Sequence, residues 1–209
     1  MKKIVRKLGI KFDVLICVIS FIGIILNFIL FKSLAGFLYF TIFSNLMCFI
    51  FYLYSIIKKI RTKDYLSPWY AKIKSLVLLS LICTFLIYNF FLVPTNEVVV
   101  YKGHFMISSF VHIITPLLVL ADCLARAKGK LLEYKDLLLY LSSMLFYGTT
   151  VIIYMLCGGL FLNGNKYPYF LFNVEKYGII NCIIMTLSIL AVYEILGLII
   201  IILNRKIAD

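Results

Sequence analysis

Long apolar runs separated by short polar connections dominate the chain from end to end. Six of these runs are about 20 residues long, the length at which an α-helix crosses the hydrocarbon core of a bilayer. We therefore predict an all-α integral membrane protein, built as a six-helix bundle in a single domain over residues 1–209. The predicted helices cover residues 12–31, 37–57, 74–93, 107–125, 136–157 and 178–203, with ends uncertain by a few residues.

The fourth run differs from the others because polar and helix-breaking residues interrupt it. Between Ile107 and Arg126 it contains His112, Pro116 and Asp122. An ionisable side chain at membrane depth is costly, and it is by default a sign of function. Pro116 has no N–H to donate to the carbonyl of His112, so we predict that the helix loosens where the histidine lies. The alternative is a harmless kink beside a histidine that only bonds a neighbour.

Composition supports a membrane protein and excludes a soluble core. The chain is 64% hydrophobic and only 14% charged, whereas soluble domains are about 45–50% apolar. The six cysteines are spread one to each predicted helix without a CxxC pair, and there are only two histidines, so we expect no metal and no cofactor. Abundant isoleucine and lysine are typical of an AT-rich bacterial genome.

The net charge of +12 would by itself suggest a nucleic-acid partner, but the distribution of the charge does not. Nearly all of the 21 Lys and Arg residues fall on one side of the predicted bundle. The positive-inside rule then places both termini in the cytoplasm of a cell membrane. Anionic lipids of the inner leaflet are the expected partner of this charge, and nucleic acid is not. The exceptions are Lys32, Lys102, Lys166 and Lys176.

Five predicted helices each place a polar residue at a similar depth. With a rise of about 1.5 Å per residue, these side chains lie roughly 5–8 Å below the outer boundary of the membrane. Odd and even helices run in opposite directions, so sequence spacing does not impose this agreement, and we predict a shared pocket near the outer leaflet. Ser44 and Asn45 follow on the same helix face as one of the five. The five residues are Asn27, Thr41, Asn89, His112 and Asn181.

A second polar layer is predicted near the cytoplasmic boundary. It contains Asp13, Asp122, Arg126 and Glu194. Arg126 follows Asp122 at i+4, which allows an ion pair on one helix face. Two interpretations stay open for this layer, namely structural ion pairing and a path for protons.

The outer layer offers a hydroxyl, an imidazole and several amides. A hydroxyl needs an adjacent base before it can act as a nucleophile, and His112 can accept the proton of Thr41. Asp122 is ten residues from His112, roughly 15 Å along a helix, so it cannot orient the imidazole. The chemistry that fits is hydrolysis of a lipid ester by a Thr–His dyad. The alternative is a membrane carrier, or a protein that binds a lipid or small ligand in the same pocket. Candidates for binding substrate or stabilising an oxyanion are Asn45, Ser44, Asn181, Asn89 and Asn27.

An aromatic segment, residues 167–172, precedes the last predicted helix. Aromatic side chains gather where membrane meets water, so the segment is expected at the headgroup level. Two interpretations stay open. The segment either closes the bundle as a lid or belongs to an ordinary aromatic belt.

Three motifs together give the chain a family resemblance. They are Tyr39-Phe40-Thr41-Ile42-x-Ser44-Asn45-Leu46, His112-x-x-x-Pro116-Leu117-x-x-Leu120-x-Asp122 and Tyr167-Pro168-Tyr169-x-Leu171. In this combination and order the chain resembles the androgen-induced protein family over nearly its whole length. The resemblance implies six transmembrane helices and, as in the animal members, a threonine-dependent hydrolase of fatty acid esters of hydroxy fatty acids. It assigns the nucleophile to Thr41 and the histidine to His112, while Asp122 looks typical of the bacterial members.

Overall fold

The computed structural model describes residues 2–62, 67–93, 104–126 and 131–206. Within these ranges, six helical spans are long and apolar enough to cross a membrane, which confirms the predicted all-α membrane fold. Two of the spans contain a π-helical turn, η2 (Tyr88–Leu92) after α3 and η3 (Phe110–Ile114) between α4 and α5. The α-helices are α1 (Lys2–Phe31), α2 (Phe40–Arg61), α3 (Pro68–Ile87), α4 (His104–Ser109), α5 (Thr115–Ala125), α6 (Leu137–Leu156), α7 (Val174–Tyr177) and α8 (Ile179–Lys206).

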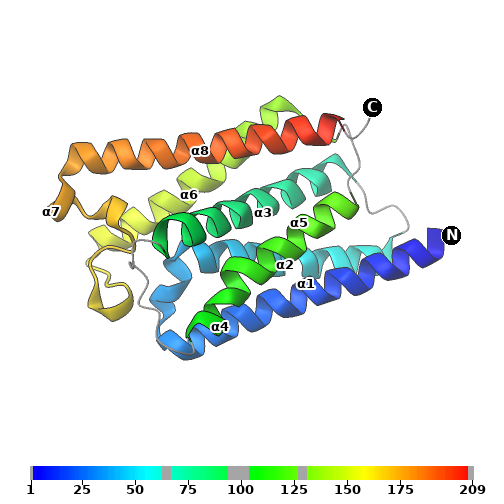
Figure 1. The fold of residues 1–209 in the computed structure, drawn as a ribbon, viewed down its shortest axis with the longest axis horizontal. Coiled ribbons are helices and arrows are strands. Elements are labelled where there is room, and N and C mark those ends of the chain that lie inside the picture. Colours follow the sequence, from blue (N-terminus) through cyan, green and yellow to red (C-terminus); the bar gives the residue numbers. More distant parts are fainter. Residues whose placement is uncertain (1, 63–66, 94–103, 127–130, 207–209) are drawn as a thin grey trace.

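Helices α2 and α3 form the middle of the bundle, with α1 and α5 on one side and α6 and α8 on the other (Figure 1). One apolar cluster joins α2 and α3 to α1 and α5, and a second joins them to α6 and α8. In the most apolar stretch of each span, 56% of the residues are buried for α3 but only 17% for α8. Helix α8 is therefore peripheral, and most of its surface is left to face lipid.

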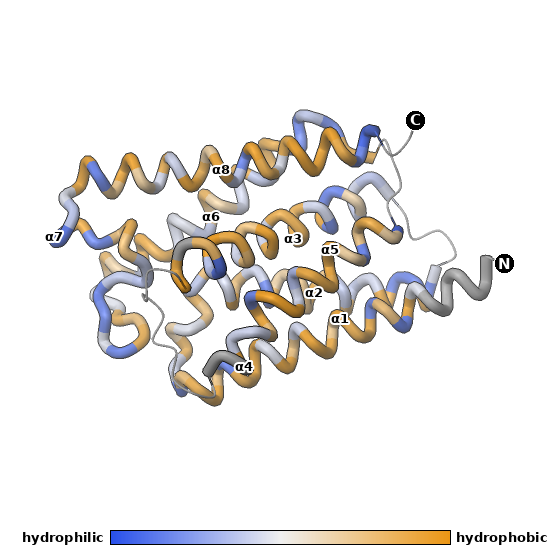
Figure 2. Tube along the Cα trace, in the orientation of Figure 1, coloured by the Kyte–Doolittle hydropathy of each residue, from blue (hydrophilic) through white to orange (hydrophobic). Residues whose placement is uncertain are grey.

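Both chain termini lie at one end of the bundle, here called the terminal end; the opposite end is the loop end (Figure 1). Hydrophobic residues run along the helices, and hydrophilic residues concentrate near both ends (Figure 2). Two helices finish in basic residues at the terminal end, α2 with Lys58, Lys59 and Arg61 and α8 with Arg205 and Lys206. The charge asymmetry that the sequence predicted thus corresponds to one end of the folded bundle.

The helix ends differ from the predicted ones mainly where basic residues lie. Helix α3 begins at Pro68 rather than at residue 74, and α1 begins at Lys2 rather than at residue 12. Ser67 caps α3 by accepting a hydrogen bond from the Tyr70 N–H at 3.2 Å, and proline suits the first helical turn. Helix α3 contains its basic residues because they find anions inside the protein: Lys72 Nζ lies 2.7 Å from Asp136, and Lys74 Nζ lies 2.7 Å from Asp122.

The fourth span loosens at its histidine, as predicted. In η3 the Thr115 N–H bonds to the Phe110 carbonyl, five residues earlier, and Pro116 follows in the first turn of α5. A close approach by α1 holds this turn in place, since a Cβ added at Gly23 would lie 2.8 Å from Val111 Cγ1. The π turn in η2, closed by the Val93 N–H on the Tyr88 carbonyl at 2.9 Å, was not predicted. Such turns are rare and occur frequently at functional sites.

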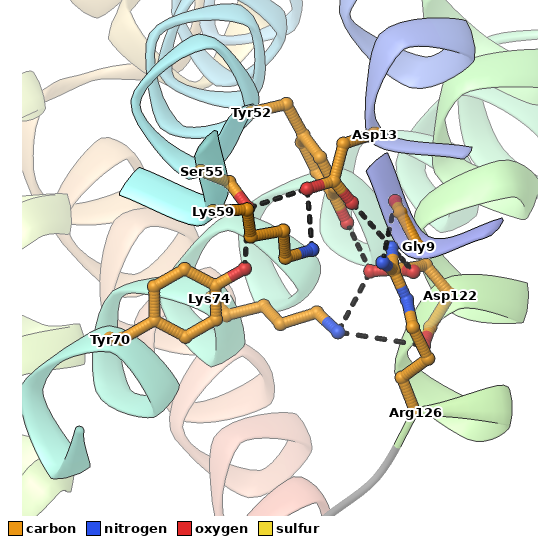
Figure 3. A network of polar contacts seen from close by, with 9 residues as sticks. All are labelled: Gly9, Asp13, Tyr52, Ser55, Lys59, Tyr70, Lys74, Asp122 and Arg126. Atoms are coloured by element: carbon orange, nitrogen blue, oxygen red, sulfur yellow. Dashed lines mark hydrogen bonds and ion pairs between the residues drawn. The ribbon is translucent and has the colours of Figure 1, made fainter. Parts of the chain in front are cut away.

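A buried ion cluster joins four helices at the terminal end (Figure 3). Asp13 of α1 is fully buried, and its carboxylate lies 2.5 Å from Lys59 Nζ of α2 and 2.6 Å from Arg126 Nη2 beyond α5. Ser55 donates a further hydrogen bond to Asp13 at 2.6 Å. Each charge of this centre has an opposite charge in contact, so α1, α2 and α5 are fixed to one another here.

The second carboxylate of the cluster is Asp122 of α5, also buried. It pairs with Arg126, as the i+4 spacing predicted, and with Lys74 Nζ of α3 at 2.7 Å. Tyr52 of α2 donates to it at 2.8 Å. Glu194, the remaining member of the predicted inner layer, is not part of the cluster, because it lies half-buried on α8 across the bundle. The prediction gave these four residues a similar depth, and three of the four meet in the fold.

Replacing Asp13 with asparagine should destabilise the fold strongly. The change keeps the shape of the side chain but leaves Lys59 and Arg126 without their shared anion, and removing one partner of a buried pair costs about 3–5 kcal/mol. We expect a clearly lower Tm in detergent micelles. The control is Glu175→Ala, which removes the solvent-exposed Lys166–Glu175 pair and should leave the Tm nearly unchanged. Equal Tm values for the two variants would mean that the cluster does not stabilise the bundle.

Candidate active site

A hydroxyl and an imidazole meet at the loop end of the bundle. Thr41 Oγ1, in the first turn of α2, lies 3.2 Å from His112 Nε2, in the π turn η3. This is within the hydrogen-bond reach expected between a nucleophile and its base in a site without substrate. The structure therefore brings together the two residues that helix depth and family resemblance had each singled out.

Ser108 fixes the orientation of the imidazole. His112 Nδ1 lies 2.9 Å from the Ser108 carbonyl and 2.8 Å from Ser108 Oγ. Because a carbonyl only accepts hydrogen bonds, Nδ1 carries the proton, and Nε2 is left to accept from the Thr41 hydroxyl. A main-chain carbonyl thus holds the imidazole here as a carboxylate does in the catalytic triads of serine hydrolases.

Tyr88 of η2 completes the setting of the histidine. Its ring stacks on the imidazole, with 3.6 Å between ring centroids and 18° between the planes. The Tyr88 hydroxyl accepts a hydrogen bond from Ser108 Oγ at 2.9 Å. The two π turns, η2 and η3, therefore lie opposite each other. The Ser108 hydrogen bond holds the edge of the imidazole, and the Tyr88 ring covers one of its faces.

The aromatic segment before α7 closes over the start of α2. The Phe40 N–H, one of the donors that the first helical turn leaves unpaired, bonds to Tyr169 Oη at 2.8 Å. Burial raises the pKa of the Tyr169 phenol above its usual value, so the group stays protonated. Because its oxygen accepts from Phe40, the Tyr169 hydroxyl keeps a hydrogen that it can donate. This contact favours the lid over a plain aromatic belt.

A cavity of about 1080 Å³, here called the polar pocket, surrounds the dyad. Thr41, His112, Tyr88 and Asn27 line it from the helices, and the segment 161–170 covers it from the loop end. Its volume lies just above the range usual for ligand sites, about 300–1,000 Å³. The dyad is thus accessible to a ligand of substantial size.

Three of the predicted polar candidates lie around the dyad, and two of them join helices there. Asn45 donates from Nδ2 to the carbonyls of Thr41, at 2.8 Å, and Val111, at 3.0 Å, and so joins α2 to η3. Ser44 bonds to the Thr41 carbonyl and to Thr84 Oγ1, both at 3.0 Å. Asn27 lines the polar pocket and donates to the carbonyl of residue 23 in its own helix at 2.8 Å. Asn45 and Ser44 therefore position Thr41, and of the three only Asn27 faces the pocket.

The other two candidates lie outside the pocket. Asn181 is exposed on α8 and donates to the Tyr177 carbonyl at 2.9 Å. Asn89 donates to the Phe85 carbonyl at 2.8 Å and is not among the residues that line the cavity. The predicted pocket shared by five helices is wrong in these two positions, because similar depth does not make two side chains face the same side.

Sequence reasoning missed three residues of the site, Tyr88, Ser108 and Tyr169. Tyr169 belongs to a motif of the family resemblance and to the aromatic segment, so a signal for it was present. Ser108 lies four residues before His112, the spacing of a same-face helical neighbour. No local pattern marks Tyr88. In the part of the chain that the structure describes, no three His, Cys, Asp or Glu side chains are close enough to share a metal ion.

The tautomer of His112 can be checked by nitrogen NMR of the protein in micelles. We expect two-bond correlations to show the proton on Nδ1 and a bare Nε2, because the Ser108 carbonyl fixes the Nδ1 proton. A His104→Gln background isolates the signal of His112. Ser108→Ala is the matched control and should keep the same tautomer, since the carbonyl remains. A proton on Nε2 would rule out His112 as the acceptor of the Thr41 proton.

Comparison with known proteins leaves the family of the chain unassigned. No family model, characterised protein or solved structure matches it. The resemblance to the androgen-induced protein family stays a prediction based on three motifs, and the inference of function rests on the geometry of Thr41 and His112.

Proposed function

We propose that this protein is an intramembrane hydrolase of lipid esters, with Thr41 as nucleophile and His112 as general base and acid. The observation that carries the proposal is the contact of 3.2 Å between Thr41 Oγ1 and His112 Nε2. The fixed Nδ1 proton, the stacked tyrosine and the surrounding pocket support it. Without an adjacent base a threonine hydroxyl is a weak nucleophile, and His112 Nε2 lies within reach of the Thr41 proton.

In the first half of the reaction, Thr41 Oγ1 bonds to the ester carbonyl carbon while its proton passes to His112 Nε2. The carbonyl oxygen becomes an oxyanion. When the tetrahedral intermediate collapses, the bond from carbon to the alcohol oxygen breaks, and His112 returns the proton to that oxygen. The alcohol leaves, and the acyl group remains on Thr41 as an ester.

In the second half, water from the polar pocket attacks the acyl carbon and gives a proton to His112. The bond to Thr41 Oγ1 breaks, the threonine recovers its proton, and the carboxylic acid is released. The positive end of the α2 dipole lies beside Thr41 and favours the negative charge of the oxyanion. The Tyr169 hydroxyl, held at the same helix end by the Phe40 N–H, is the side-chain donor best placed to stabilise the oxyanion.

The proposal includes the membrane and its orientation. The positive-inside rule places the terminal end in the cytoplasm and the dyad near the outer leaflet of a cell membrane. The basic residues of the terminal end then face anionic inner-leaflet lipids. The alternative of a carrier depends on Asp122 or Glu194 as a mobile charge, and the contacts of Asp122 with Lys74, Arg126 and Tyr52 argue against that role.

Substitution of either dyad residue should abolish turnover. We expect Thr41→Ala to lose both ester hydrolysis and covalent labelling by a fluorophosphonate probe, and His112→Ala to lower both by about a thousandfold or more. The measurement is probe labelling in detergent micelles together with hydrolysis of a p-nitrophenyl ester. Thr150→Ala is the matched control, because the Thr150 hydroxyl is exposed on α6 and donates only to its own helix.

Full labelling of both dyad variants would refute the proposal. If labelling and hydrolysis are absent in the wild type as well, while a ligand crosses vesicle membranes in a manner dependent on Asp122 or Glu194, the carrier alternative holds instead. Folding of each variant is checked by its Tm, so that loss of activity is not confused with loss of structure.

Removal of the Tyr169 hydroxyl should slow the chemical step. We expect Tyr169→Phe to lower kcat by about 100-fold with little change in KM, as for the loss of one oxyanion donor. Steady-state hydrolysis of the same p-nitrophenyl ester measures this. The control Tyr134→Phe removes an exposed hydroxyl at the terminal end and should not change kcat. An unchanged kcat in Tyr169→Phe would show that the oxyanion is stabilised elsewhere.

A further inference from the structure

A second cavity, here called the apolar cleft, lies between α3, α6 and α8. Its volume is about 390 Å³, and apolar side chains form most of its wall. Cys83 and Ile87 of α3, Met144 of α6 and Ile189 of α8 are among the residues that line it. A site of this size and character suits a hydrocarbon chain, which gains free energy from apolar contact and has no polar group to satisfy.

The apolar cleft opens toward lipid between α6 and α8. Toward the terminal end these helices are tied together, since Tyr193 Oη lies 3.3 Å from Ser143 Oγ and 3.0 Å from Ser80 Oγ. From there α6 diverges from α8 toward the loop end (Figure 1). Ile184 and Val192, which line the cleft, are each more than half exposed. A lipid chain can therefore enter sideways without leaving the membrane.

Thr41 stands where the two cavities meet. It lines both the polar pocket and the apolar cleft, together with Tyr88, Leu92, Tyr169 and Phe170. His112 lines the polar pocket and not the apolar cleft. The nucleophile thus faces both spaces, whereas the base that must later protonate the leaving group faces only one.

We propose that the apolar cleft binds the acyl chain of the ester and that the alcohol leaves through the polar pocket. This assignment rests on the proposed function. His112 delivers its proton to the alcohol oxygen as the carbon–oxygen bond breaks, so that oxygen must lie on the side of His112, in the polar pocket. The acyl carbon bonded to Thr41 then directs its chain into the other space. The substrate class is an ester of a long-chain fatty acid with a polar alcohol.

Because Gly148 of α6 has no side chain, the space beside it in the cleft is left free for an acyl chain. It lines the cleft, and a Cβ added there would meet no atom within 4 Å. A larger side chain at this position therefore occupies the cleft without clashing with the protein. Gly148→Leu should lower kcat/KM for p-nitrophenyl palmitate by about tenfold or more, because about three methylenes lose their apolar contact. Hydrolysis of p-nitrophenyl butyrate should stay within about twofold of the wild type.

Gly36 provides the matched control on the other side of Thr41. It lines the polar pocket, and a Cβ added there also meets nothing within 4 Å. Gly36→Leu should leave the acyl-length preference unchanged and lower hydrolysis of butyrate esters of larger alcohols. Gly148→Ala is a second variant at the test site, expected to shift the preference in the same direction by less. If the leucine variant does not fold, Gly148→Ala is used to test the assignment.

Two results would overturn the assignment while leaving the esterase intact. In the first, Gly148→Leu changes the preference for the alcohol rather than for the acid, which reverses the orientation. In the second, Thr41-dependent hydrolysis persists with no change in acyl-length preference in either Gly148 variant. If instead the wild type hydrolyses no ester and Thr41 is not labelled, the proposed function fails, and the assignment fails with it.

Discussion

Water is absent from the middle of a bilayer, so a polar side chain there must find its hydrogen-bond partner within the protein. At the loop end of this bundle, that constraint decides which helix surfaces meet. Asn45 bonds to one carbonyl of its own helix and to one of the facing π turn, and Ser44 bonds across to α3. These contacts bring α2 against η3 at the level of Thr41 and His112. The dyad thus follows from where the Asn45 amide nitrogen and the Ser44 hydroxyl find their hydrogen-bond partners.

The membrane spans and the pairing of Thr41 with His112 could both be predicted from the sequence, for different physical reasons. Apolar runs of the right length define spanning helices almost by themselves, because an unpaired backbone is too costly in lipid. Thr41 and His112 were found because depth along a helix follows directly from residue number. Pro116 predicted the loosening of the fourth span, because the missing N–H acts locally on a carbonyl that the sequence identifies.

What could not be predicted depends on the direction in which a helix faces and on contacts between distant segments. Asn181 and Glu194 have suitable depths, but α8 packs against the bundle by another face. The stacking of Tyr88 on His112 requires two π turns to oppose each other, and the sequence of neither segment shows that the two meet. Ser67 and Pro68 did carry a signal for the start of α3, but the surrounding lysines suggested a connection instead.

The bundle divides into two parts with different tasks. Helices α1 and α2, with the fourth span, hold the dyad and the buried ion cluster, whereas α6 and α8 add an apolar wall to one side of α3. Thr41 is the point where the two parts meet. The separation explains how one hydroxyl can lie beside both a polar cavity and an apolar one.

The ion cluster also has a consequence for biosynthesis. Asp13 lies 46 residues before Lys59 and 113 residues before Arg126. A ribosome therefore delivers the acid to the membrane long before the two cations that contact it, and the first of these arrives with α2. Once Arg126 has been translated, every member of the cluster is present, before α6 or α8 exists. The first four spans can thus assemble with both buried carboxylates of the cluster already paired, and the last two spans dock onto them.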